Sequence, residues 1–396
     1  MRVALVSQEY PPETAKGGIG TQTYAKAKGL AALGHEVHVI SRSPQGGRCE
    51  YRDGDVCVTR IGDFCHRMPI HNWAVDCLTY RAEVAAEIAA LHVRRPVDVV
   101  EFPEWGGEGY IHLLNRPETD RIPAVVQLHG PLVMCAHVSG WPEVDSDLYR
   151  VGTSMEGTCV RLADAVYSSS AYSAKWCAES YGLPVEKIPV IHTGVDVRQF
   201  APLGGSQESR PTVIFVGRIS RNKGADVLFE ACCLLARELP NLQLRLLGRD
   251  KDHLVDNFRA RSIDLGLPDL LDFPGFVGRE QLPSYLNRAH VFAAPSRFEG
   301  GPGLVNLEAM SCGLPVVIAS GTGAAEVVRD GKNGMLVPPG DAQALASALG
   351  RLLSNPGLRA EMGRAARRYV LENADSESCL KQIEAFLLAH SRRSSL

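Results

Sequence analysis

The feature that most constrains this fold is a regular alternation of short, β-branched apolar runs with longer amphipathic segments. Runs of this length predict buried strands, and the segments between them show helical periodicity. Strands that alternate with helices predict βαβ units and a parallel sheet covered on both faces. In the first half of the chain we expect strands at 3–6, 36–40, 97–100, 124–128, 165–167 and 189–191, with helices that include 25–33 and 82–91.

The pattern starts again after a polar, turn-rich stretch at 202–211 that has the composition of a linker. With 396 residues, the chain suits two domains of roughly 200 residues each. The sequence therefore predicts an α/β protein with two Rossmann-like domains facing across a cleft, 1–200 and 201–375. In the second domain we expect strands at 212–216, 243–247, 271–273, 291–294, 315–318 and 335–337, with helices that include 227–239, 304–311 and 342–353.

Composition excludes several classes of protein. The formal net charge is −3, which provides no field to attract nucleic acid or an anionic membrane. The first apolar run is too short for a signal peptide, and no run approaches the ~18 apolar residues of a spanning helix. We therefore expect a cytoplasmic protein. The 11 cysteines form no CxxC pair and are interpreted as buried thiols.

In facing doubly wound domains, ligands bind beyond the carboxyl ends of the strands. A glycine-rich turn that includes Gly17, Gly18 and Gly20 follows the first strand and leads into a helix. Glycine lets the backbone approach a ligand, and a helix N-terminus favours anions, although any tight turn also favours glycine. The turn lacks the GxGxxG spacing of dinucleotide-binding proteins, which disfavours a dehydrogenase.

Two further features of the first domain follow predicted strands. His129 comes directly after the strand at 124–128 and is followed by Gly-Pro, which points it towards the cleft, although a core histidine is an open alternative. Glu101, Glu104 and Trp105 lie in a glycine-rich loop, and an aromatic ring among carboxylates suits carbohydrate binding. They are candidate acceptor contacts, with an ordinary structured loop as the alternative.

The second domain carries a stronger pattern. The strand at 212–216 is followed by Gly217, Arg218 and Lys223, and these two cations suit phosphate oxygens. After the strand at 291–294 a glycine-rich loop with Glu299 enters a helix near Gly303, and Glu308 lies about one turn inside. Free N–H groups at such a helix start can hold a diphosphate, and carboxylates can accept hydrogen bonds from sugar hydroxyls.

Together these motifs resemble family 4 of the glycosyltransferases, which are retaining enzymes of the GT-B fold, over nearly all of the chain. The resemblance rests on the first glycine-rich turn, His129, the run from Ile191 to Asp196, the cationic loop and the stretch from Glu299 to Pro315. It implies that a C-terminal helix within 376–396 returns to the first domain.

The resemblance also implies roles for single residues. Arg218 and Lys223 would neutralise the donor diphosphate, Glu299 would hold the donor sugar, and His129 would lie beside the reacting sugar. Glu308 would hold the ribose. The resemblance also implies donor contacts at Gly18 and Gly217. Phe276 and Val277 would lie at the base, and the backbone amides of Gly303, Leu304 and Val305 would meet the phosphates.

One departure from the family concerns the two glutamates. Eight residues separate Glu299 from Glu308, one more than is usual in the family, and this puts the reach of Glu299 in question. The chain also contains aspartate pairs with DxD spacing, but they lie outside the cationic and glycine-rich loops described above. We therefore expect no metal and no cofactor. The aspartate pairs are Asp53/Asp55, Asp145/Asp147 and Asp250/Asp252.

We therefore expect a retaining, metal-independent glycosyltransferase that moves a hexose-type sugar from a nucleotide sugar, with a UDP-sugar favoured, to an acceptor hydroxyl. The acceptor could be a carbohydrate, a natural product or a lipid-linked molecule, with at most peripheral membrane contact. The alternatives are a nucleotide-sugar epimerase of the same architecture and a non-catalytic nucleotide-sugar-binding subunit. The oligomeric state is not indicated.

Overall fold

The computed structural model describes residues 1–12, 18–62, 72–205 and 207–395. The chain divides into two compact units, the first made of Met1–His192 with Glu377–Leu396 and the second of Thr193–Ser376. The stretch expected as the linker lies inside the second unit and packs on it. Within this stretch, Arg210 donates hydrogen bonds to the carbonyl groups of Asn241 and Leu242 at 3.1 and 3.2 Å. Its turn-rich composition therefore marks a packed loop, and the division between the units comes earlier, at residues 192 and 193.

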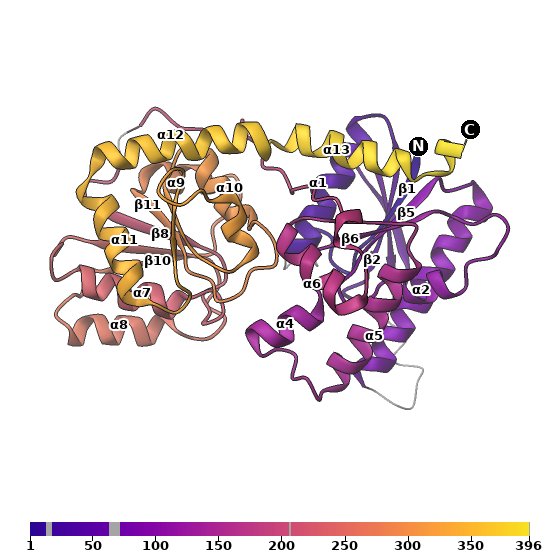
Figure 1. Cartoon of the computed structure of the whole chain (residues 1–396), viewed down its shortest axis with the longest axis horizontal. Coiled ribbons are helices and arrows are strands. Elements are labelled where there is room, and N and C mark those ends of the chain that lie inside the picture. The colour runs from indigo at the N-terminus through magenta and orange to yellow at the C-terminus, as the bar shows by residue number, and fades with distance from the viewer. Residues whose placement is uncertain (13–17, 63–71, 206, 396) are drawn as a thin grey trace. The chain divides into compact units, whose positions relative to one another are not determined.

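The first unit is built on a seven-stranded sheet with the order β3-β4-β2-β1-β5-β6-β7 (Figure 1). All neighbouring strands are parallel except the pair β3 and β4. Without β3, the order is that of a Rossmann sheet, so the strand order reverses between β1 and β5. The strands are β1 (Arg2–Val6), β2 (Glu36–Arg42), β3 (Cys49–Asp53), β4 (Val56–Ile61), β5 (Val99–Pro103), β6 (Ala124–Leu128) and β7 (Ala165–Ser168).

Helices cover both faces of this sheet. Side chains of α2, α3, α5 and α6 share one buried cluster with Ala4 and Val6 of β1, whereas α1 and α13 share another with Val3 and Leu5. Successive residues of a strand point to opposite faces, so the apolar run in β1 serves both clusters. The helices are α1 (Gly18–Ala32), α2 (Trp73–Arg94), α3 (Tyr110–Leu114), α4 (Leu132–Ser139), α5 (Asp147–Leu162), α6 (Ala171–Tyr181) and α13 (Ser376–Ala389).

The second unit is built on a six-stranded parallel sheet with the order β10-β9-β8-β11-β12-β13, the same Rossmann order. Its strands are β8 (Thr212–Val216), β9 (Gln243–Leu247), β10 (Leu271–Gly275), β11 (Val291–Ala294), β12 (Val316–Ala319) and β13 (Met335–Val337). Its helices are α7 (Ala225–Leu235), α8 (Val255–Asp264), α9 (Leu282–Arg288), α10 (Leu304–Ser311), α11 (Ala342–Ser354) and α12 (Pro356–Asn373). The 3₁₀ helices of the described chain are Val185–Lys187, Gly323–Val327 and Arg392–Ser395.

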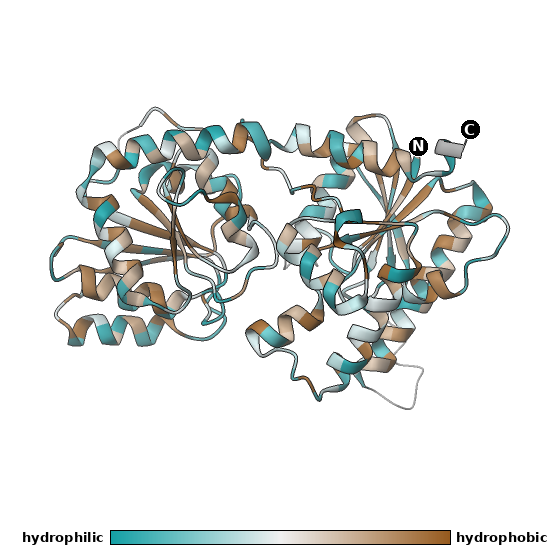
Figure 2. Ribbon diagram, in the orientation of Figure 1, coloured by the Kyte–Doolittle hydropathy of each residue, from teal (hydrophilic) through white to brown (hydrophobic). Residues whose placement is uncertain are grey.

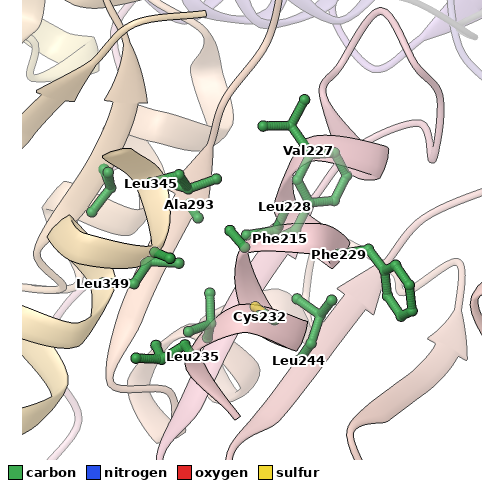
Figure 3. Packing of buried hydrophobic residues seen from close by; sticks show 14 of the residues in the cluster. Phe215, Val227, Leu228, Phe229, Cys232, Leu235, Leu244, Ala293, Leu345 and Leu349 are labelled. Atoms are coloured by element: carbon green, nitrogen blue, oxygen red, sulfur yellow. The ribbon is translucent and has the colours of Figure 1, made fainter. Parts of the chain in front are cut away.

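The core of the second unit also has two sides. Val213 and Phe215 of β8 share a buried cluster with α7, α8 and α11, and Figure 3 shows Phe215 among labelled residues of α7 and α11. Ile214, on the other face, packs with α9, α10 and α12. Most of the strands are largely apolar and the helices are banded (Figure 2). This is the expected pattern for a parallel sheet buried on both faces, and it confirms the predicted fold class.

The structure differs from the predicted elements at two places. The β3–β4 hairpin was not predicted, because β3 is a polar, mostly exposed edge strand. The run at 189–191 makes only a single bridge between Ser168 and Val190 rather than a strand.

The C-terminal helix α13 packs on the first unit. Phe386 lies against the ring of Tyr167, with 5.2 Å between centroids, and Glu384 pairs with His35 at 2.6 Å. Gly29 of α1 leaves room for Leu380, because a Cβ at Gly29 would lie 2.4 Å from a Leu380 methyl carbon. In the described part of the chain, no helix has the length and apolar content to cross a membrane.

Candidate functional site

The strand order of the second unit reverses between β8 and β11, which are hydrogen-bonded neighbours. Loops that leave such a pair lead to helices on opposite faces and open a crevice at the carboxyl ends of the strands. Gly217 to Gly224 follow β8, and Pro295 to Gly303 follow β11. The topology therefore brings the two motifs that the sequence singled out to one place.

Glycine allows these two loops to touch. Gly224 ends the first loop with φ of 72°, and a Cβ there would lie 2.1 Å from the carbonyl oxygen of Pro295. A larger residue would suffer both the unfavourable backbone conformation and the clash. The close approach is what places side chains of both loops within contact distance.

Lys223 and Glu299 form the central contact of this site. The Lys223 ammonium donates to the Glu299 carboxylate, and the two side chains are 21% and 24% exposed. The extra residue between the glutamates thus leaves Glu299 within reach of the cationic loop. Arg218 is exposed and has no partner among the described residues, so its charge is available to an anion.

Arg297 holds the two loops together, a role that the sequence did not reveal. Its guanidinium donates to both carboxylate oxygens of Asp226 at 2.7 and 2.9 Å, and its backbone N–H donates to the carbonyl of Asn222 at 2.9 Å. Paired, planar contacts of this kind are geometrically specific. No short-range pattern links this arginine to Asp226 in the first turn of α7, so only the fold identifies the pair.

Helix α10 begins at the end of the loop that contains Arg297 and Glu299. Its N-cap residue, Gly303, has φ of 71° and provides no side-chain cap. In the described structure the backbone amides of Leu304 and Val305 have no acceptor, whereas those of Asn306 and Leu307 donate to the Gly303 carbonyl. Free amides and the positive end of a helix favour an anion at this point.

Glu308 lies one turn into α10 and is only 1% exposed. Burial raises the pKa of its carboxyl to about 7, and the nearby Arg279 acts in the opposite direction. The Arg279 guanidinium lies 2.7 Å from Oε1 of Glu308. This contact is an ion pair, and the second carboxylate oxygen, Oε2, accepts no hydrogen bond from the described residues. The carboxylate therefore keeps acceptor capacity.

The loop after β10 contains the residues expected at the nucleotide base. Gly275 has φ of 84°, and Phe276 beyond it is 70% exposed. The guanidinium of Arg249 lies over the Phe276 ring, 5.4 Å from its centroid. An exposed ring beside a cation is a surface on which a base can stack.

His129 of the first unit follows β6 and is held through its backbone. The amides of His129 and Gly130 both donate to one carboxylate oxygen of Glu104, the first at 2.7 Å. The imidazole Nδ1 is buried and has no partner among the described residues. Burial, and next the charge of Lys26, lower the pKa of His129 to about 3, so the ring is neutral at physiological pH.

Gly18 is the first residue of α1, and a Cβ there would meet open space. Gly20 packs tightly, because its Cβ would lie 2.7 Å from the Cβ of Glu9. Gly17, which the motif also includes, lies outside the described residues. The described part of this turn therefore leaves an accessible backbone at Gly18.

The three predicted acceptor contacts differ in their burial. Glu101 is 6% exposed and binds the ammonium of Lys26, with Tyr167 donating to its second oxygen at 2.9 Å. Glu104 is completely buried and accepts the two amides described above. Both carboxylates therefore face the protein interior, although Oε2 of Glu104 is buried without a hydrogen-bond partner among the described residues, whereas Trp105 is partly exposed. A loop sequence does not reveal which of its side chains turn inward.

Two of the aspartates with DxD spacing accept hydrogen bonds from backbone amides. Asp250 accepts the amides of Leu254 and Val255 at the start of α8, at 2.9 and 3.0 Å. Asp252 accepts the amide of Arg221 at 2.9 Å. No group of three or more potential metal ligands occurs among the described residues.

Two family models match the chain. Residues 16–199 match the model described as Glycosyltransferase Family 4, and residues 198–369 match Glycosyl transferases group 1. One relative is a GDP-mannose-dependent alpha-(1-6)-phosphatidylinositol monomannoside mannosyltransferase of Mycolicibacterium smegmatis. It is 30% identical over 391 residues, with 93% of this chain and 94% of the relative covered.

Another relative is a D-inositol 3-phosphate glycosyltransferase of Kribbella flavida, which is 31% identical over 401 residues and covers 92% of this chain and 90% of its own. Among solved structures, sucrose-phosphate synthase of Thermosynechococcus elongatus superposes with a TM-score of 0.79 at 23% identity, covering 97% of this chain and 98% of its own. That likeness concerns the fold alone.

Proposed function

The chain belongs to family 4 of the glycosyltransferases and has their GT-B fold, and we propose that it transfers a hexose-type sugar from a nucleoside diphosphate sugar to an acceptor hydroxyl without a metal ion. The observation that carries this proposal is the contact between Lys223 and Glu299 at the strand reversal, with Glu299 in the same loop that leads to the free amides of α10. A cation, an unneutralised arginine and a helix N-terminus suit a diphosphate, and the carboxylate suits sugar hydroxyls.

The chemistry depends on where charge develops. When the bond between the anomeric carbon and the phosphate oxygen breaks, negative charge grows on the departing diphosphate. Lys223, Arg218 and the amides of Leu304 and Val305 are placed to stabilise that charge as preorganised donors. These groups supply the electrostatic role that a metal ion has in other phosphate chemistry.

The stereochemistry proposed is retention of anomeric configuration. The acceptor oxygen forms its bond to the anomeric carbon on the face that the diphosphate leaves, and a phosphate oxygen takes the acceptor proton. The described residues suggest no enzymic nucleophile for a covalent intermediate. Neutral His129 and the accessible backbone of Gly18 are proposed as first-unit contributions to binding the reacting sugar.

The donor base and the acceptor are narrower proposals. The sequence favours a UDP-sugar as the donor. The relative from Mycolicibacterium smegmatis is named for GDP-mannose, so a GDP-sugar must be tested equally. That relative and the Kribbella flavida relative are named for inositol-containing acceptors. A polyhydroxylated ring, free or lipid-linked, is therefore the acceptor class to examine first.

The test is binding of UDP, GDP and ADP, measured by thermal shift with and without EDTA. We expect stabilisation by one nucleoside diphosphate that EDTA does not change. Stabilisation by none of them, or only with added Mg²⁺, would contradict the proposed donor site. With the selected donor, NMR of the products should show a new glycosidic bond of unchanged anomeric configuration. Donor epimerisation without transfer would indicate the epimerase instead.

A further inference from the structure

Arg279 is a cation of the second unit to which the sequence assigned no role. It lies in the segment between β10 and α9, and its side chain is 43% exposed. Its guanidinium is paired with Glu308, whose side chain is 1% exposed. An exposed arginine that reaches a nearly inaccessible carboxylate neutralises a charge that water cannot solvate.

Packing sets the position of Arg279. Its guanidinium lies over the ring of Phe200, 5.1 Å from the ring centroid, and Phe200 itself is completely buried. The Arg279 carbonyl accepts a hydrogen bond from the side chain of Gln199 at 3.4 Å. The charge of Arg279 is thus held beside Glu308 by a fixed aromatic surface.

The other titratable and charged groups around Glu308 are few. Cys312, one turn further along α10, is a buried thiol whose pKa is raised to about 12, so it stays neutral. Arg367 of α12 donates to the carbonyl groups of Phe200 and Ser311, at 2.8 and 2.7 Å, and so is directed at the backbone. Among the described residues, Arg279 is therefore the cation that pairs with Glu308.

Glu308 nevertheless has unused acceptor capacity. Its Oε1 is paired with the Arg279 guanidinium at 2.7 Å, whereas Oε2 accepts no hydrogen bond from the described residues. A buried acceptor without a donor is costly unless a ligand completes it. An ionised carboxylate only accepts hydrogen bonds, which matches the adjacent hydroxyls of a ribose.

We propose that Arg279 is a positioning residue of the nucleotide site, which favours the ionised form of Glu308 so that its carboxylate can accept hydrogen bonds from the ribose hydroxyls. The proposal rests on the function proposed above, since it assigns the ribose to Glu308. Arg279 acts through Glu308 and need not touch the nucleotide. It therefore controls the pH range in which a nucleoside diphosphate binds.

The sign of the pH dependence follows from burial. The pKa of Glu308 is raised to about 7, so the carboxylate forms as the pH rises through neutrality and nucleotide affinity increases. Without Arg279 the charged form loses its partner, and the increase moves to higher pH by about one unit or more. Since Glu308 titrates at about pH 7, a shift of one unit lowers its ionised fraction at pH 7, and with it the affinity, by roughly fivefold, and by about tenfold only at lower pH.

The experiment is isothermal titration of UDP and GDP from pH 6 to pH 9. The variants are Arg279→Ala, Arg279→Lys, Glu308→Gln and the double variant Arg279→Ala/Glu308→Gln, with Arg351→Ala as a control for loss of an exposed arginine in α11. Phosphate groups also titrate near pH 6. Glu308→Gln provides the reference that removes their contribution.

We expect Arg279→Ala to move the rise in nucleotide affinity to higher pH. Arg279→Lys should return this rise most of the way to the wild-type pH. In the Glu308→Gln background, Arg279→Ala should have no further effect, because its route of action is gone. Arg351→Ala should match the wild type.

Two outcomes would overturn the inference about Arg279 and leave the proposed function intact. The wild type could bind a nucleoside diphosphate with a pH profile that Arg279→Ala leaves unchanged. Alternatively, Arg279→Ala could weaken binding equally in both backgrounds, which would mean that Arg279 contacts the nucleotide directly. Failure of the wild type to bind either nucleotide at any pH would overturn both the inference and the proposed function.

Discussion

At the scale of single residues, Lys223 carries the sharpest prediction about turnover. Lys223→Ala should lower kcat by about 100-fold or more, the usual loss for one preorganised donor to a developing oxyanion. The matched control is Arg221→Ala in the same loop, because the Arg221 side chain is 71% exposed and lies 3.8 Å from Asp226. Steady-state assays with the identified donor provide the measurement, and circular dichroism checks the fold. Equal rates in the two variants would contradict the assignment of Lys223 to the diphosphate site.

Glu104 carries a prediction about positioning. In Glu104→Ala the amides of His129 and Gly130 lose their acceptor, and each buried, unpaired donor costs about 1–3 kcal/mol. In Glu104→Gln the amide oxygen can still accept both, so we expect stability and activity close to the wild type. Denaturant unfolding of both variants tests this. If the two are equally destabilised, the carboxylate charge rather than hydrogen bonding holds the His129 turn.

At the scale of elements, contact between the loops that precede α7 and α10 depends on Gly224. Gly224→Ala should destabilise the second unit and abolish nucleotide binding, because its Cβ would meet the Pro295 carbonyl. Gly266→Ala is the control, since Gly266 has a similar positive φ of 71° but open space around it. Both variants bear a left-handed backbone penalty of about 1–2 kcal/mol. Thermal denaturation and UDP or GDP titration should show a larger loss in Gly224→Ala, and equal losses would mean that the loops separate without consequence.

At the scale of the whole molecule, buried carboxyls set the pH dependence of stability. Burial, and next the charge of Glu104, raise the pKa of Glu156 to about 8, whereas an unfolded glutamate titrates near ~4.3. The contribution of protonated Glu156 to the free energy of unfolding is therefore fully present below pH ~4.3. It is lost as the pH rises to about 8. Relative to Glu156→Gln, the wild type should therefore lose stability between pH 5 and pH 8, by on the order of a few kcal/mol. Urea unfolding at several pH values measures the difference, and a constant difference would contradict it.

Much of the fold follows from local patterns. The strands at 124–128, 212–216, 243–247, 291–294 and 335–337, and the helix at 304–311, have the predicted limits. Each is a mainly apolar segment bounded by turn residues, so short-range preferences and burial agree. The polar strand Cys49–Asp53 was missed because its partner β4, rather than an apolar face, makes it a strand. The turn-rich stretch at 202–211 was misread as a linker because composition does not show what a loop packs against.

The sequence by itself determined the two Rossmann-like sheets, the family and the chemical types present in the loops, since apolar periodicity and glycine positions are local properties. Only the tertiary structure decided which charges meet. It turned Glu101 and Glu104 inward, paired Lys223 with Glu299 and Arg297 with Asp226, and placed Arg279 on Glu308. The physical reason is that burial and ion pairing depend on distances between segments far apart in the chain. Those distances are set when the sheets form and are not encoded in any one segment.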